Sequence, residues 1–194
     1  YSGAASTIID GSGAGNGIHV AKAADGVRIE GFTIRNWSYG IYLAGESDDT
    51  IVGAVVADNV VAGSVTGAIS GTYVNNSVFE NNTWHDGDGF GIDLYVADAN
   101  TIRNNQVYDN DGFGIRVYGE SIALASDNNV IAVNSVYNVG QDGIRIGPRA
   151  KNTQVLTNTV YSTTSSGGDG GIVLVGSENS QVKYNDVHDV GAPS

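Results

Sequence analysis

Short apolar runs, interrupted by Gly, Asn and Asp, recur along the whole chain. Each run carries two apolar residues that lie five positions apart, and successive pairs begin about 25 residues apart. The pairs are Ile29/Ile34, Val55/Val60, Phe79/Trp84, Ile102/Val107, Ile131/Val136, Val155/Val160 and Val182/Val187. A repeat of this length built from short strands predicts one coil of a parallel β-helix, a solenoid in which successive coils stack. Leucine-rich repeats have a similar length, but their Leu-x-x-Leu-x-Leu signature is missing.

A second element in each repeat follows Gly and alternates apolar with other residues. Alternation with period two is typical of a strand with one buried face, so the apolar members are expected to point inward. These members are Ile18/Val20, Ile41/Leu43, Ile92/Leu94, Ile115/Val117, Ile144/Ile146 and Ile172/Leu174. Helical repeats are disfavoured, because no long stretch has a period of 3.6 residues. We predict an all-β fold, a right-handed parallel β-helix of about seven or eight coils, in which the register of the third coil, near 67–71, stays undefined.

One polar position recurs between the paired apolar residues. Along the chain it reads Phe32, Asp58, Asn82, Asn105, Asn134, Asn158 and Asn185. In stacked coils these side chains would lie about 4.8 Å apart and form a hydrogen-bonded Asn ladder. Alternatively, Asn serves here only as a turn residue that tolerates a positive φ. Both explanations predict a coil.

The composition fits one domain. The 194 residues include 28 Gly, 2 Pro and no Cys, and 41% are hydrophobic, which is enough apolar material for one core with many tight turns. Without Cys there are no disulfides or thiolate metal sites, and no apolar run reaches the length of a membrane span. We expect a single β-helix domain over residues 1–194, or a fragment of a longer solenoid. Because the chain begins at Tyr1 without an apolar leader, we expect a mature extracellular, secreted protein or an excised piece.

The net charge of −12 limits the classes of partner that the protein is expected to bind. Nucleic-acid binding needs a basic surface and is not expected. The charge permits Ca²⁺ binding, and three acidic turns offer oxygen ligands, although short Asp/Gly turns usually serve as turns only. These turns are Asp86-Gly87-Asp88, Asp109-Asn110-Asp111 and Gly167-Gly168-Asp169. We expect that no cofactor is required and that Ca²⁺ is a compatible ion.

If Ile92 and Leu94 point inward, the residues between and after them point outward. Equivalent positions of stacked coils then form two outward columns. The first reads His19, Tyr42, Asp93, Arg116, Arg145 and Val173, and the second reads Ala21, Ala44, Tyr95, Tyr118, Gly147 and Val175. The rings and guanidinium groups of these columns are expected to form a groove. Its candidate catalytic residues are Asp93, Tyr95 and Arg116, and its candidate substrate-binding residues are Tyr42, Tyr118, Arg145, Arg149 and Lys151.

Such a groove suits an acidic polysaccharide. Arg binds carboxylates bidentately, and Tyr packs on sugar faces while offering a hydroxyl group. The alternative is a solvated strand face with a weak pair between Asp93 and Arg116 of the next coil. A third outward column is expected to stack and to be structural. It consists of His85, Tyr108, Tyr137, Tyr161 and His188.

The repeat Ile-x-x-Asn-x-Val followed by Gly-Ile-x-Val resembles right-handed parallel β-helix proteins of the pectate-lyase-like superfamily. The stretch 87–158 resembles the catalytic module of mannuronan C5-epimerases, chiefly through GIRVYGESIALASDNNVI at 114–131. The resemblance implies polyuronate (alginate) chemistry on the outward groove. In that family a Tyr-Gly-Phe-Asp-Pro-His strand and an Asp of the next coil carry the reaction. Here Asp93 matches, whereas Phe90 and Tyr95 replace the Tyr and the His, and Arg116 occupies the second Asp position.

Two functions stay open. The first is a polysaccharide-directed module that binds, and in the manner of the resembled family epimerises or cleaves, an acidic polysaccharide. In that case Tyr95 and Arg116 would supply the proton transfer and the charge neutralisation that abstraction next to a carboxylate needs. The second is a non-catalytic structural β-helix that self-associates end to end into filaments. It is favoured by the absence of a capping helix or a polar capping coil, because bare strand edges invite pairing.

Overall fold

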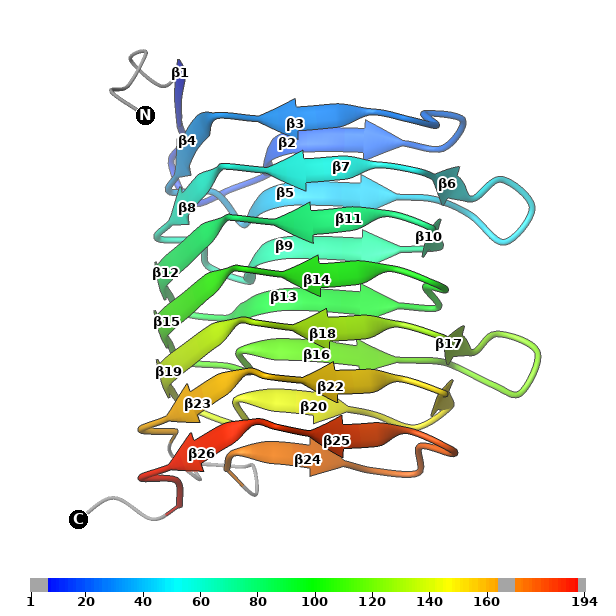
Figure 1. Ribbon diagram of the computed structural model, residues 1–194. Coiled ribbons are helices and arrows are strands. Elements are labelled where there is room, and N and C mark those ends of the chain that lie inside the picture. Colours follow the sequence, from blue (N-terminus) through cyan, green and yellow to red (C-terminus); the bar gives the residue numbers. More distant parts are fainter. Residues whose placement is uncertain (1–6, 164–169, 192–194) are drawn as a thin grey trace.

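The computed structural model describes residues 7–163 and 170–191, and every regular element within these ranges is a β-strand. The strands form a stack of coils in which each coil contributes one strand to each of three parallel sheets (Figure 1). The three sheets have seven, seven and eight strands, so the predicted all-β parallel solenoid of about seven or eight coils is confirmed. Within the described ranges there is no helix long and apolar enough to cross a bilayer.

The chain visits the three sheets in the same order in every coil. Sheet 1 contains β2 (Asn16–Ala21), β5 (Tyr39–Ala44), β9 (Gly67–Thr72), β13 (Phe90–Tyr95), β16 (Ile115–Tyr118), β20 (Ile144–Ile146) and β24 (Ile172–Leu174). Sheet 2 contains β3 (Arg28–Glu30), β7 (Val55–Ala57), β11 (Val78–Glu80), β14 (Thr101–Arg103), β18 (Val130–Ala132), β22 (Gln154–Leu156) and β25 (Gln181–Lys183). Sheet 3 contains β1 (Thr7–Asp10), β4 (Phe32–Arg35), β8 (Val60–Ala62), β12 (Thr83–Gly87), β15 (Gln106–Asn110), β19 (Ser135–Val139), β23 (Thr159–Tyr161) and β26 (Asp186–His188). Two short pairs, β6 (Ile51–Val52) with β10 (Val74–Asn75) and β17 (Ser126–Asp127) with β21 (Ala150–Lys151), lie between sheets 1 and 2.

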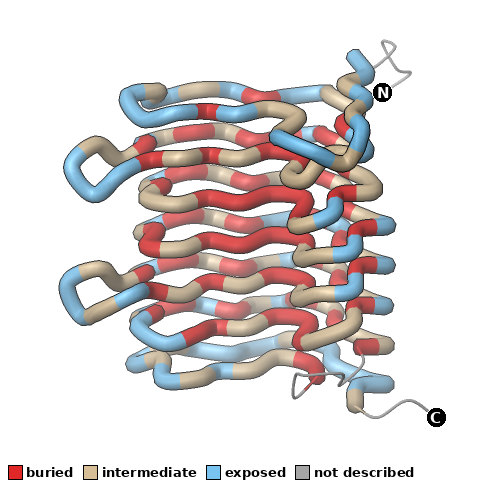
Figure 2. The backbone as a smooth tube through the Cα atoms, turned by 180° about the vertical axis from the view of Figure 1, so that it is seen from behind, coloured by how far each residue is buried: buried red, intermediate tan, exposed pale blue. Residues whose placement is uncertain are grey.

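The core runs along the axis of the stack. The predicted inward residues of sheet 1, such as Ile92 and Leu94, are fully buried, and so are Ile102 of sheet 2 and Val107 of sheet 3. Figure 2 shows buried residues concentrated in the middle coils, with more exposed residues on the coils at the two ends. Each buried aliphatic side chain contributes about 1.5–3 kcal/mol relative to an exposed one. The hydrophobic pattern of the sequence therefore places the core correctly.

The register of the second repeat differs by one residue from the prediction. Val56, not Val55, lies beside Ile29 and Phe79 in sheet 2, and Val61, not Val60, occupies the corresponding place in sheet 3. Two Val doublets five residues apart satisfy the spacing in either register, so the pattern alone could not choose between them. The third coil, which the pattern left undefined, is β9, paired in register with β5 and β13.

The predicted Asn ladder is present, but its second-repeat member is Asn59 and not Asp58. Asp58 instead takes the positive-φ turn position just before it, with φ 55°. In each step the amide nitrogen of one Asn donates to the side-chain oxygen of the next at 2.9–3.1 Å. The ladder runs through Asn59, Asn82, Asn105, Asn134, Asn158 and Asn185. The same oxygens accept backbone N–H groups, so the bend between sheets 2 and 3 carries satisfied buried polar groups.

A second polar row, which the sequence analysis missed, lines the bend before sheet 2. Asn100 donates to the side-chain oxygen of Asn129 at 3.1 Å, and the backbone N–H of Ser77 donates to Asn100. All three side chains are buried. The row contains Ser as well as Asn, so no single residue type marks it in the sequence.

The aromatic column of sheet 3 stacks as predicted. Neighbouring rings lie 4.9–5.1 Å apart between centroids and within 8° of parallel, from His85 through Tyr108, Tyr137 and Tyr161 to His188. Ring stacking of this regularity follows from the in-register pairing of β12, β15, β19, β23 and β26.

Candidate functional site

Sheet 1 brings the predicted outward residues together across its middle coils. β13 and β16 pair in register, so Asp93 lies beside Arg116 and Tyr95 lies beside Tyr118. β20 continues the first column with Arg145. These five residues, taken from three strands separated by more than twenty positions in sequence, form one continuous surface.

Asp93 and Arg116 form a bidentate ion pair. Arg116 donates from Nε to Oδ1 of Asp93 at 2.6 Å and from Nη2 to Oδ2 at 2.9 Å. The hydroxyl of Tyr118 donates to the same Oδ2 at 3.4 Å. Asp93 is only 6% exposed, although it faces outward, because the rings around it cover it. Desolvation lowers the pKa of Arg116, but the hydrogen bonds and the charge of Asp93 outweigh it, so this pKa is raised overall.

Aromatic rings cover the faces of both guanidinium groups. The Cζ atom of Arg116 lies 4.5 Å from the ring centroid of Tyr118, 4.9 Å from that of Phe113 and 5.8 Å from that of Phe90. The Cζ atom of Arg145 lies 5.5 Å from the centroid of Phe113. At these distances the rings attract the cations through cation–π interactions.

Arg145 forms an ion pair with a different carboxylate, that of Asp142. Its Nη1 atom donates to Oδ2 of Asp142 at 2.6 Å, and the Asp142 side chain is fully buried. Asp142 also accepts the backbone N–H of Gly170 through Oδ1. Asp142 thus fixes Arg145 in place from beneath the surface, as Asp93 fixes Arg116.

The sequence pattern did not indicate Phe113 and Asp142 as site residues, and it indicated Phe90 only as the replacement for the Tyr of the resembled family. Alternation counted back from Ile92 would place Phe90 inside, but Gly91 and Ile92 both face the interior. A Cβ atom on Gly91 would lie 2.3 Å from Cγ1 of Val107, a core atom. The glycine breaks the alternation and turns Phe90 outward. The recurring Asp-Gly-Phe-Gly-Ile at 111–115 and Gly-Asp-Gly-Phe-Gly-Ile at 87–92 was the signal available.

A second group of rings lies on the first coils of the same sheet. Tyr42 stacks on His19 with centroids 5.3 Å apart and on Tyr39 with centroids 5.2 Å apart. Tyr39 in turn contacts Phe90, with centroids 6.2 Å apart. Phe90 spans the intervening coil because that coil has Gly67 there, and a Cβ atom on Gly67 would lie 2.1 Å from the Phe90 ring.

The two groups of rings therefore form one surface, called the aromatic strip below. Its members are His19, Tyr39, Tyr42, Phe90, Tyr95, Phe113 and Tyr118, with Arg116 and Arg145 between the rings. From His19 to Arg116 it covers four coil steps, about 19 Å at the usual strand spacing. Desolvation, with the nearby charge of Asp93, raises the pKa values of Tyr39 and Tyr118.

Tyr95 lies at the edge of the strip, tilted against Tyr118 with ring centroids 4.9 Å apart. Desolvation and a hydrogen bond with Glu120 raise the pKa of Tyr95 to about 12. Its phenol therefore keeps its proton at neutral pH. With both carboxylate oxygens of Asp93 bound to Arg116, the three candidate catalytic residues are held as a neutral phenol and an ion pair.

Arg149 and Lys151 do not join the strip. Lys151 belongs to β21, which pairs with β17 at the bend toward sheet 2, and its Nζ atom lies 3.4 Å from a carboxylate oxygen of Glu178. Arg149 is exposed in the turn before β21, with φ 62°.

The acidic turns do not assemble a metal site in the part of the chain that the structure describes, where no group of three or more His, Asp or Glu side chains could hold a metal ion. The turn 167–169 lies outside the described residues. Asp86 contacts His85, whose Nδ1 atom is 2.7 Å from its Oδ2 atom. Ca²⁺ binding therefore stays a prediction.

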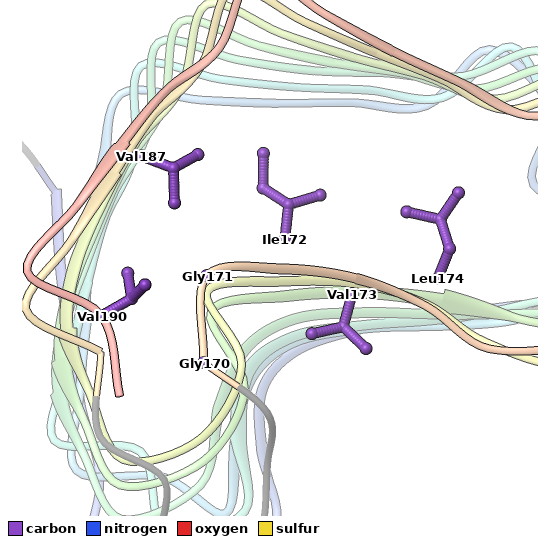
Figure 3. A pocket seen from close by; sticks show the side chains of 7 residues that line it. All are labelled: Gly170, Gly171, Ile172, Val173, Leu174, Val187 and Val190. Carbon is purple, nitrogen blue, oxygen red and sulfur yellow. The ribbon is translucent and has the colours of Figure 1, made fainter. Parts of the chain in front are cut away.

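An apolar hollow of about 410 Å³ opens at the last described coil, away from the strip. Figure 3 shows Ile172, Leu174, Val187 and Val190 around it, with Val173 on the other side of the strand. Leu174, Val187 and Val190 are about 40% exposed there. No further coil covers these side chains within the described residues.

Comparison with known proteins agrees with this architecture. The sequence model described as a right-handed β-helix region matches residues 16–187, and a search of curated proteins found no match. The predicted right-handed winding is thereby confirmed.

Three solved structures illustrate the likeness. A periplasmic alginate epimerase has a TM-score of 0.64 and 19% identity over 92% of this chain and 48% of its own. The A-module of an Azotobacter vinelandii mannuronan C-5 epimerase has a TM-score of 0.59 and 18% identity over 87% of this chain and 54% of its own. A Streptococcus pneumoniae surface protein and adhesin has a TM-score of 0.54 and 14% identity over 89% of this chain and 55% of its own. The chain spans about half the length of these proteins. At such identities the likeness shows the fold alone, and it confirms the predicted similarity to mannuronan C5-epimerase modules at that level.

Proposed function

Because the chain belongs to the family of right-handed β-helix proteins, we propose that its aromatic strip binds a polysaccharide lying along the stack of coils. The observation that carries this proposal is the continuous surface on sheet 1 from His19 to Tyr118, in which ring contacts run from His19 to Phe90 and the Arg116 guanidinium group joins Phe90 to Phe113 and Tyr118. The alginate epimerases of similar fold act on a polysaccharide by name, which supports the same class of partner here.

The chemistry of the strip fits a sugar polymer. Ring faces pack against the C–H groups of pyranose rings, and Tyr hydroxyls offer hydrogen bonds at the same contacts. Tyr39, Tyr42, Phe90, Phe113 and Tyr118 are each partly exposed. Rings lie on four of the five successive coils from β2 to β16, with none on β9, so the strip presents several contacts along the stack, which suits a linear polymer. We place the protein outside the cytoplasm, like the periplasmic epimerase and the surface adhesin.

We assign binding rather than conversion to the strip. Catalysis by Asp93, Tyr95 and Arg116 stays a prediction, as does the acidic character of the polysaccharide. A base for proton abstraction at neutral pH would have to come from a group that is ionised and available, whereas Asp93 is held by Arg116 and Tyr95 is protonated. Incubation with mannuronan followed by proton NMR tests this assignment, and new epimer or unsaturated-end signals would contradict it.

Binding itself is tested by affinity electrophoresis and calorimetry with a panel of soluble polysaccharides, neutral and acidic. Phe113→Ala and Tyr42→Ala should each weaken binding, because they remove rings from two parts of the strip. Tyr137→Ala is the matched control, since it removes a stacked ring from sheet 3 and leaves the strip intact. Equal losses in all three variants, or no binding to any polysaccharide, would exclude the proposal.

The exposed apolar end favours a second candidate function, self-association of the solenoid end to end. The first and last described coils have apolar side chains in the same three columns of the cross-section. Ile18, Val20 and Ile29 begin the columns that end at Ile172, Leu174 and Val182. Leu174 and Val182 are exposed at the last described coil, whereas Val20 and Ile29 are buried in the first. A first coil of one copy stacked on the last coil of another would continue these columns, and such a head-to-tail contact generates filaments.

Sedimentation velocity across a concentration series tests this candidate. Wild-type protein should form larger species as concentration rises, and Val187→Lys should abolish them by placing a charge in the contact. Thr83→Lys, on the outward face of β12, is the control for added charge. A wild-type chain that stays monomeric at every concentration would exclude self-association.

A further inference from the structure

We infer that the polysaccharide of the aromatic strip is uncharged, a neutral glycan rather than a polyuronate. This inference rests on the proposed function and names its substrate class. The sequence favoured an acidic chain because two guanidinium groups face outward. The structure shows that each of those groups already has a carboxylate of the protein as its partner.

Asp93 occupies guanidinium donors of Arg116 that a ligand would otherwise use. Arg116 gives Nε and Nη2, one of the two edges with which a guanidinium group can clamp a carboxylate, to Asp93. A sugar carboxylate could take this edge only by displacing Asp93, which is 6% exposed and would lose its partner inside a ring-lined surface. An unpaired buried carboxylate is costly, so the exchange is unfavourable.

The positive charges along the strip are balanced by carboxylates of the protein. The cations Arg116 and Arg145 are matched by Asp93 and Asp142, and Glu120 adds a further carboxylate beside Tyr95. The whole chain carries a net charge of −12. A polyanion would therefore approach a surface without surplus positive charge on a strongly acidic protein, and the protein's field would oppose its binding.

The groups of the strip that remain for a ligand to contact are mostly uncharged. Above the ion pairs the strip offers ring faces and Tyr hydroxyls, and both guanidinium groups lie against the Phe113 ring, with Cζ atoms 4.9 and 5.5 Å from its centroid. Ser70 lies in register between Tyr42 and Asp93 and adds no charge. Ring faces and neutral hydrogen-bonding groups match a neutral sugar chain, whose hydroxyls pair with them and whose C–H faces pack on the rings.

The decisive experiment compares two oligosaccharides that differ in charge alone. β-1,4-linked mannan and mannuronan oligosaccharides of equal length share a backbone, and the second has a carboxylate where the first has a hydroxymethyl group. Calorimetry with the full chain should give mannan an affinity at least about tenfold higher than that of mannuronan, because each mannuronan carboxylate would lack a partner on the strip. Mannan binding should not change with salt, whereas any mannuronan binding should strengthen as salt screens the repulsion.

A single variant checks the cause. Asp93→Asn keeps the shape of the side chain and removes its charge, which releases Arg116 for an incoming carboxylate. It should raise the affinity for mannuronan about tenfold relative to the affinity for mannan. Tighter binding of mannuronan than of mannan by the wild-type chain, weakening with salt, would overturn this inference and leave the proposed function standing. Absence of binding to any glycan would overturn both.

Discussion

Asp93 and Arg116 lie 23 positions apart in sequence and close a bidentate pair between neighbouring coils, with Nε–Oδ1 and Nη2–Oδ2 distances of 2.6 and 2.9 Å. Such pairs join coils through side chains as the sheets join them through the backbone. Because the Asp93 side chain is 8% exposed and the Arg116 side chain 26%, the pair is screened less than a surface pair.

Arg116→Met should destabilise the protein by about 2 kcal/mol. The substitution keeps much of the side chain's length and leaves Asp93 as a lone, poorly solvated carboxylate, and the partial exposure of Arg116 keeps the cost below that of a fully buried pair. Urea unfolding followed by circular dichroism measures it. The double variant Asp93→Asn/Arg116→Met should recover part of the loss. If the double variant is less stable than Arg116→Met, the loss comes from packing and not from the charge.

Asn105→Leu should cost about 3 kcal/mol, because Asn105 is a central rung of the ladder. Its Oδ1 accepts the backbone N–H and the side-chain amide of Asn82, and its amide donates to Asn134 and to the carbonyl of Phe79. Leucine has similar volume and leaves these buried partners unsatisfied. Asn104→Gly is the matched control, since the neighbouring Asn104 is exposed with φ 56° and glycine accepts that conformation. Similar midpoints for the two variants in chemical denaturation would show that the ladder contributes little.

How far the sequence alone predicts this molecule depends on whether a feature repeats. Ile92, Leu94 and Asn105 belong to columns with the same residue types in most coils, so the repeat places them without a structure. The ladder position of the second repeat was predicted at Asp58 and lies at Asn59, because the neighbouring Val doublets fit the spacing in two registers. The pair of Asp93 with Arg116 was anticipated as a weak one, since a sequence does not show the rings that bury it.

Tyr95 should titrate late. Desolvation and the hydrogen bond with Glu120 raise its pKa to about 12 from an ordinary value of 10.0. The neutral phenol is the form favoured by folding, so its contribution to stability is present below pH 10 and is lost as pH rises toward 12. Ultraviolet difference titration of wild type against Tyr95→Phe should isolate one late-ionising phenol. In Glu120→Gln the same difference should shift to lower pH, and an unchanged curve would mean that Glu120 has no part in the shift.

Gly91→Ala should weaken both stability and glycan binding, because Gly91 breaks the alternation that would otherwise direct Phe90 into the core. The new methyl group would lie 2.3 Å from Cγ1 of Val107 and 2.5 Å from the carbonyl oxygen of Gly114, and overpacking of this kind costs about 1–3 kcal/mol. Relief of the clash by a shift of β13 would also move Phe90 away from Tyr39.

Val107→Ala provides the test of this mechanism, because it removes the methyl group that Gly91→Ala meets. In a double-mutant cycle the two substitutions should couple favourably, with the double variant more stable than the sum of the single losses predicts. Glycan affinity should recover in part in the double variant along with stability, because the contact with Val107 is relieved while that with the carbonyl oxygen of Gly114 remains. Strictly additive losses in unfolding free energy, or an affinity that stays low once stability has recovered, would show that the glycine does not act through Val107.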